Sequence, residues 1–173
     1  MKDQTNLDRD AELEGLALEY SKSFTKFSDI EGVIIRGHIL IEQALNRSIE
    51  LTVLNKSEYN ADRFSFAQKI QIANMLGISE FFKTELNSLN KLRNQIAHSL
   101  KYEEKYIDVI IKGIYKKDSK LFGNKKDKYK SLIIAISFIA GAISYGHEYA
   151  KHTLLKKQIE SVAKAKQKTL PKK

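Results

Sequence analysis

The chain has few of the residues that interrupt helices. Proline occurs once among the 173 residues, at Pro171, and glycine occurs eight times. A β-sandwich or barrel needs many turns, and glycine and proline supply most of them. Apolar residues make up 42% of the chain and charged residues 29%, enough apolar side chain for one buried core. The sequence predicts an all-α fold, with one helical domain over 1–157 and a basic, frayed or disordered tail over 158–173.

Two features bear on the cellular compartment. The chain has no cysteine, and therefore no disulfide framework and no thiolate zinc site. Its first residues, MKDQTNLDRDAELEG, mix both charges and lack the apolar core of a signal peptide. The expected location is the cytoplasm.

Apolar residues recur at three- and four-residue intervals in several stretches, which is the spacing of amphipathic helices. Residues 100–115 fit either a short helix or a strand, and 116–130 read as a basic connection. We expect Gly77 to end one helix in a left-handed conformation and Ser79 to cap the next. The predicted helices span about 8–28, 31–54, 66–76 and 79–98.

The predicted helix 31–54 is apolar on two sides. Val33, Gly37 and Ile41 belong to its main apolar face, whereas Ile35 and Ile39 point elsewhere. A second apolar side is usually covered by another helix of the chain or by a partner subunit. This pattern is one reason to expect a homodimer.

Residues 131–146 carry no charge. The run is shorter than the roughly 20 apolar residues of a membrane span, and it contains three serines. Small residues at Ser137, Ala140, Gly141 and Ser144 permit a close neighbouring helix. We therefore expect a central core helix, and no membrane partner.

The net charge of +9 is concentrated near the C-terminus, with an excess of +6 in 112–130 and +7 in 151–173. Such segments suit a polyanion, although lysine-rich segments are also common as solvated surface. If the polyanion is RNA, the lysines expected to hold it in the first segment are Lys116, Lys117, Lys125, Lys126 and Lys128.

The stretch LNSLNKLRNQIAH, residues 86–98, is the most informative for chemistry. At 100° per residue it places Asn94 and His98 on a polar stripe, and Arg93 within the apolar face. An unpaired buried guanidinium is costly, so Arg93 must be paired, must extend to water or must face a polar crevice. A structural alternative pairs Arg93 with Glu42 and clamps two helices together.

The catalytic alternative uses the same residues for phosphodiester cleavage. Histidine moves protons near neutral pH, and arginine matches the developing charge on a phosphate. Five residues separate Arg93 from His98, an offset of about 140° around a helix, so one protomer does not readily aim both at one atom. Two protomers packed along this helix can do so. No metal site and no cofactor motif accompany these residues.

The segment Arg93-Asn94-Gln95-Ile96-Ala97-His98 resembles the Arg-x4-6-His motif of the HEPN (higher eukaryotes and prokaryotes nucleotide-binding) superfamily. RGHILIEQALN at 36–46, FAQKIQIANMLG at 66–77 and LNKLRNQIAHS at 89–99 also resemble, in order, the signature blocks of the mannitol repressor family, which is similar to HEPN domains. The resemblance implies an antiparallel helical bundle with a lysine-rich C-terminal extension.

The resemblance also implies a function. Many HEPN domains are homodimeric, metal-independent ribonucleases of toxin–antitoxin and anti-phage systems. It implies that His98 transfers protons, that Arg93 stabilises the charged phosphorane and that Asn94 orients His98 or contacts phosphate. Glu42 and His38, four residues apart on the preceding helix, are candidate supporting residues.

The expected partners are therefore a second copy of the chain, RNA, and an antitoxin or regulatory protein. The alternative function is that of a non-enzymatic helical regulator, like the mannitol repressor, which acts through protein contacts. The sequence shows no helix-turn-helix with a basic recognition helix, so it does not support direct reading of DNA.

Overall fold

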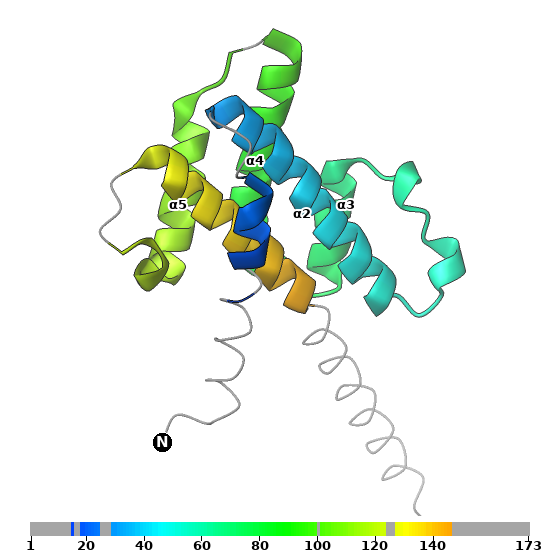
Figure 1. Cartoon of the computed structure of the whole chain (residues 1–173). Helices are drawn as coiled ribbons and strands as arrows, with labels where there is room; N and C mark the ends of the chain where they lie inside the picture. The colour runs from blue at the N-terminus through cyan, green and yellow to red at the C-terminus, as the bar shows by residue number, and fades with distance from the viewer. Residues whose placement is uncertain (1–14, 16–17, 25–28, 100, 124–126, 147–173) are drawn as a thin grey trace, which may run out of the picture.

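The computed structural model describes residues 15, 18–24, 29–99, 101–123 and 127–146 (Figure 1). All regular secondary structure within these residues is helical, so the predicted all-α class is confirmed. Most of the predicted helix 8–28 and the whole tail 158–173 lie outside the described residues.

Five longer helices form the body of the bundle. Four of them lie close to the predicted ranges, and the fifth settles the ambiguous stretch after residue 100 as a helix. They are α2 (Ile30–Thr52), α3 (Phe66–Met75), α4 (Lys83–Ser99), α5 (Glu104–Lys117) and the helix Lys128–Gly146. Short 3-10 turns join them: η1 (Lys22–Phe24), η2 (Lys56–Glu58), η3 (Ala61–Arg63), η4 (Glu80–Phe82) and η5 (Ser119–Phe122).

The helix Lys128–Gly146 crosses the molecule beside α2 (Figure 1). Gly37 permits the close approach, because a Cβ at this position would lie 2.7 Å from Cδ1 of Ile136. Further along, the Ser48 hydroxyl donates to the carbonyl of Ile143 at 2.9 Å. These contacts advance together along both helices, so this pair runs in the same direction, unlike the antiparallel arrangement expected throughout the bundle.

The same helix is long and apolar enough to cross a membrane, and half of its most apolar window is buried inside the structure. Leu132, Ile136, Ile139 and Ile143 are buried in the core. The side chain of Asp127 accepts a hydrogen bond from the Tyr129 amide at 2.9 Å and caps the first turn. The predicted core helix at 131–146 is therefore confirmed.

The helices α4 and α5 form an antiparallel hairpin. At its closed end Gln95 Nε2 donates to Glu103 Oε1 at 2.9 Å, and the Glu103 amide donates to Gln95 Oε1 at 3.1 Å. At its open end Lys117 Nζ donates to the buried Glu85 carboxylate at 2.5 Å. The helix α5 forms because Ile107, Ile110 and Ile114 recur at helical spacing and are fully buried.

Two details at the start of α4 test the sequence predictions. Gly77 has φ +76°, so the predicted left-handed end of α3 is confirmed. The prediction for Ser79 is wrong: its hydroxyl donates to Asn74 Oδ1 at 2.7 Å and makes no cap hydrogen bond. The turn η4 precedes the helix, which begins at Lys83.

The second apolar side of α2 is only partly covered. Ile35 is half-buried against the core, whereas Ile39 is 41% exposed.

A substitution at Gly113 tests the α4–α5 contact. A Cβ at this position would overlap the Glu85 carboxylate, which is buried and held by Lys117. Replacing glycine by alanine at an open helix position stabilises the helix by about 1 kcal/mol. Forcing an extra methyl group into a packed contact costs about 1–3 kcal/mol of folding free energy. We expect Gly113→Ala to lower the free energy of unfolding by up to about 2 kcal/mol in urea titrations followed by circular dichroism.

The matched control is Lys112→Ala, which changes an exposed neighbour on the same helix and should shift the free energy by no more than about 0.5 kcal/mol. A Gly113→Ala protein that is about 1 kcal/mol more stable than the wild type, as in an open helix, would contradict the packing described for Glu85.

Candidate functional site

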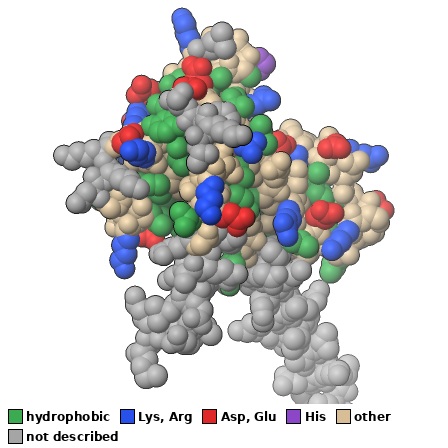
Figure 2. All heavy atoms as spheres, viewed as in Figure 1, with side chains coloured by type: hydrophobic (Ala, Val, Ile, Leu, Met, Phe, Trp, Pro, Cys, Tyr) green, Lys and Arg blue, Asp and Glu red, His purple; other side chains and the backbone are tan. Residues whose placement is uncertain are grey.

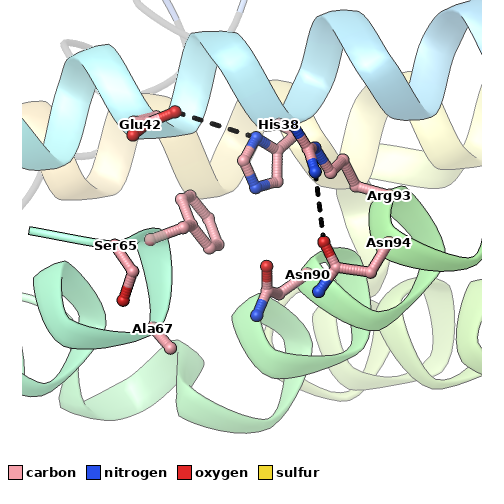
Figure 3. Close-up of a pocket in the computed structure, with 8 residues that line it drawn as sticks. His38, Glu42, Ser65, Ala67, Asn90, Arg93 and Asn94 are labelled. Atoms are coloured by element: carbon pink, nitrogen blue, oxygen red, sulfur yellow. Dashed lines mark hydrogen bonds and ion pairs between the residues drawn. The ribbon is translucent and has the colours of Figure 1, made fainter. Parts of the chain in front are cut away.

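A cavity of about 360 Å³ lies where α2, α3 and α4 meet (Figure 3). Its lining is mostly polar, and it draws side chains from all three helices. The lining residues are His38, Glu42, Ser65, Phe66, Ala67, Asn90, Arg93 and Asn94. Four of the sequence-predicted site residues, His38, Glu42, Arg93 and Asn94, are therefore brought together, and His98 is not among the lining residues.

An ion pair between α2 and α3 sets the charge of this cavity. Lys69 Nζ lies 2.6 Å from Glu42 Oε1, and the lysine side chain is only 5% exposed. A buried ammonium needs a partner, because its desolvation is otherwise uncompensated. Glu42 supplies that partner, so its carboxylate neutralises Lys69 and not Arg93. The predicted clamp between Glu42 and Arg93 does not form within the protomer.

Arg93 lies at the edge of the buried side of α4 and not within it. Leu89, Leu92 and Ile96 are buried, whereas Arg93 is exposed and extends into the cavity (Figure 3). Its Nη1 donates to Asn94 Oδ1 at 3.3 Å. No carboxylate among the described residues forms an ion pair with it. The sequence left three possibilities for Arg93: a paired side chain, one that extends to water, or one that faces a polar crevice. The structure shows Arg93 facing a polar crevice that is open to water.

His38 is only 6% exposed, and the centroid of its ring lies 4.0 Å from the centroid of the Phe66 ring. Its Nδ1 lies 3.9 Å from Glu42 Oε2, and its Nε2 has no hydrogen-bond partner. Burial lowers the pKa of His38 to about 4; Glu42 and the nearby Asn90 act in the opposite direction, and Arg93 and Lys69 add to the lowering. His38 is therefore neutral at pH 7.

His98 is exposed in the last turn of α4. A cationic side chain is favourable there, because the helix dipole places negative charge at the C-terminus. The offset of about 140° from Arg93 keeps it on another side of the helix. The predicted polar stripe is confirmed, since Asn94 and His98 are both exposed and Asn90 is half-buried.

Sequence reasoning missed the contribution of α3. Ser65 caps this helix: its Oγ accepts from the Gln68 amide at 3.4 Å, and Gln68 Oε1 accepts from the Ser65 amide at 2.9 Å. These two hydrogen bonds form a capping box. The Ser-x-x-Gln pattern at 65–68 is the sequence signal that predicts this capping box. The start of α3, at Ser65, Phe66 and Ala67, thus forms one wall of the cavity.

Two of the lysines expected to bind RNA are engaged in ion pairs. Lys117 pairs with Glu85 at 2.5 Å, and Lys128 pairs with Glu104 at 2.7 Å and with Asp108 at 3.1 Å. Lys116 is exposed at the end of α5. The remaining two, Lys125 and Lys126, lie outside the described residues.

Comparison with known proteins adds no family to this description: no family model, no curated protein and no solved structure matches the chain.

The low pKa of His38 predicts a pH-dependent stability. The unfolded state takes up a proton near pH 6.5 and the folded state only near pH 4, so stability is full above pH 6.5 and falls as the pH drops toward 4. This loss amounts to about 3 kcal/mol. We expect the wild type to lose about that much more than His38→Phe between pH 7 and pH 4, measured by urea unfolding.

His98→Ala is the matched control, because it removes an exposed histidine and should retain the pH dependence of the wild type. Equal losses in the wild type and His38→Phe would show that His38 protonates as easily in the folded as in the unfolded chain.

Proposed function

We propose that this protein is a metal-independent endoribonuclease of the HEPN type, acting as a homodimer in a cytoplasmic toxin or anti-phage system. The three sequence blocks that resemble HEPN and mannitol repressor proteins support this proposal, and so does the all-helical fold. The observation that carries it is the state of Arg93: an exposed guanidinium without a carboxylate partner among the described residues, hydrogen-bonded to Asn94.

The proposed chemistry is cleavage of an RNA phosphodiester by its own ribose 2′-hydroxyl. The 2′ oxygen bonds to phosphorus, its proton leaves to a base, and the bond from phosphorus to the 5′ oxygen breaks. The leaving oxygen takes a proton, which gives a 2′,3′-cyclic phosphate and a 5′-hydroxyl. Exposed His98 is suited to one of the two proton transfers, and Arg93 to the charge on the phosphorane.

A composite site between two protomers resolves the offset between these residues. Arg93 of one protomer and His98 of its partner can face one phosphate if the α4 helices pack along each other. The exposed Ile39 on α2 offers apolar surface for such a dimer. Asn94 accepts a hydrogen bond from Arg93, and we expect it to contact the same phosphate.

The first test is cleavage of RNA by the purified protein in the presence of EDTA. We expect Arg93→Ala and His98→Ala each to lose about 100-fold or more in rate, since each removes a charge partner or a proton-transfer group. The matched controls are Arg47→Ala, an exposed arginine on α2, and Asn87→Ala, an exposed amide on α4. Both should cleave like the wild type.

The second test distinguishes a composite site from one within a protomer. Mixed dimers of Arg93→Ala and His98→Ala chains contain one site with both residues intact. We expect unfolding and refolding the two variants together to restore cleavage, up to about half of the wild-type rate per mixed dimer. Inactive mixed dimers would contradict the composite site. An inactive wild type would contradict the nuclease and favour the helical regulator.

A further inference from the structure

We propose that residues 152–163 of this chain dock as a helix on an apolar corner formed by Met75 and Phe81. This apolar corner lies at the turn between α3 and η4, at the opposite end of α3 from the cavity. Met75 is 86% exposed and Phe81 is 75% exposed. Single exposed apolar side chains are ordinary on a protein surface, but two of them at one turn mark a candidate interaction site.

A tight turn holds the two side chains of the apolar corner close together. The Gly77 amide donates to the Asn74 carbonyl at 3.0 Å, and the Ser79 hydroxyl donates to Asn74 Oδ1 at 2.7 Å. Met75 directly follows Asn74, and Phe81 comes two residues after Ser79. The end of α3 and the start of η4 are therefore fixed to each other, and the apolar corner is formed before any partner binds.

The described chain ends beside the same turn (Figure 1). A Cβ at Gly146 would lie 2.9 Å from the Ile78 carbonyl oxygen, so glycine permits the end of the helix Lys128–Gly146 to pack on Ile78. Met75 and Phe81 each lie three residues from Ile78, and three residues span at most about 11 Å. The chain that follows Gly146 therefore starts within reach of the apolar corner.

The sequence after Gly146 has a pattern that can cover this corner. Leu155, Ile159 and Val162 recur at intervals of four and three, which places them on one side of a helix. A helix over 152–163 leaves the five residues before it for a turn, and two to five residues connect antiparallel helices. The segment is therefore long enough to turn back and lay its apolar side on Met75 and Phe81.

The charges favour the same occupant. Glu80 is exposed beside Phe81 and takes part in no ion pair among the described residues. Residues 147–173 contain eight lysines and two glutamates, so docking brings cations near this carboxylate. An isolated surface ion pair contributes little, and the apolar contacts carry most of the affinity. The proposal shortens the tail expected at 158–173.

The chain has no cysteine, so the contact can be tested by cross-linking a cysteine pair. Glu80→Cys and Gln158→Cys are combined in the full-length chain and treated with a short bismaleimide. We expect a cross-link within one chain, identified by mass spectrometry of mixed isotope-labelled and unlabelled protein. In the control pair, Lys101→Cys replaces Glu80→Cys. It should react about tenfold or more slowly, because the 17 residues of α4, about 25 Å, separate Lys101 from η4.

A cross-link only between two chains, or none at all, would overturn the proposal. A tethered but undocked tail also cross-links, because the tether keeps its effective concentration high. Two variants of the Glu80→Cys/Gln158→Cys protein therefore decide the question. Ile159→Lys places a charge on the apolar side of the segment, and we expect the cross-linking rate to fall about tenfold or more.

The matched control is Ser161→Lys, which places the same charge about 160° away around the helix. It should keep the cross-linking rate within about threefold of the parent pair. Equal rates in Ile159→Lys and Ser161→Lys would show that no particular side of the segment docks, and would overturn the proposal.

A further variant tests the apolar corner itself. Met75→Ser combined with Phe81→Ser should retain the fold, judged by circular dichroism, because both side chains are exposed. We expect the cross-linking rate to fall about tenfold, whereas Asn87→Ser, an exposed polar residue of α4, should leave it unchanged. An unchanged rate without Met75 and Phe81 would overturn the proposal. These outcomes are independent of RNA cleavage, because neither surface belongs to the proposed catalytic site.

Discussion

The ion pair between Lys69 and Glu42 is the interaction on which the candidate site depends. It joins α3 to α2 at the place where α4 crosses both, and it keeps a nearly buried ammonium group compensated. Because Glu42 is committed to Lys69, Arg93 faces the cavity without a carboxylate partner of its own. The same contact places the start of α3 beside His38, so that helix amides, an arginine and an unsatisfied imidazole surround one space (Figure 3).

The helix α4 divides its residues between two tasks. Its apolar side is buried, and Gln95 fastens it to the start of α5 through two hydrogen bonds to Glu103. Its polar side carries the arginine, the asparagines and the histidine toward the solvent and the cavity. A rigid helix that is held on one side can present such groups in a fixed geometry on the other. Within the Arg-x4-His segment, Gln95 and Ile96 thus serve the fold, and Arg93, Asn94 and His98 remain available to a ligand.

The surface of the described bundle carries both signs of charge. Lysines, arginines and acidic side chains are interspersed over the visible face of the described bundle, with apolar side chains between them (Figure 2). Several lysines near the C-terminal half are held in ion pairs, as Lys117 and Lys128 are. The large formal charge of the chain is therefore only partly available to a polyanion on the described body.

Local patterns predicted most of the fold. The helix periodicity of α2, α3, α4 and the helix Lys128–Gly146 is visible in the sequence because each helix buries one side. Gly77 marks a left-handed backbone conformation that other residues rarely adopt. The stretch around α5 was ambiguous because its short apolar pattern, interrupted by charged residues, fits both the period of a helix and that of a strand. The candidate site was predicted in part: Arg93, Asn94, His38 and Glu42 were found by residue type and spacing. A buried lysine at position 69 and the wall at the start of α3 follow from helix crossing, which no local pattern records.

The most direct measurement compares a single and a double variant of that ion pair with the wild type, with the affinity for a 2′-O-methyl RNA oligomer followed by fluorescence anisotropy. Lys69→Met frees the Glu42 carboxylate to compensate Arg93, and we predict an affinity about tenfold weaker than that of the wild type. The double variant Glu42→Gln/Lys69→Met removes both charges and should recover to within about threefold of the wild type. If Lys69→Met and the double variant bind the oligomer equally, the ion pair does not control Arg93 and the central claim is wrong.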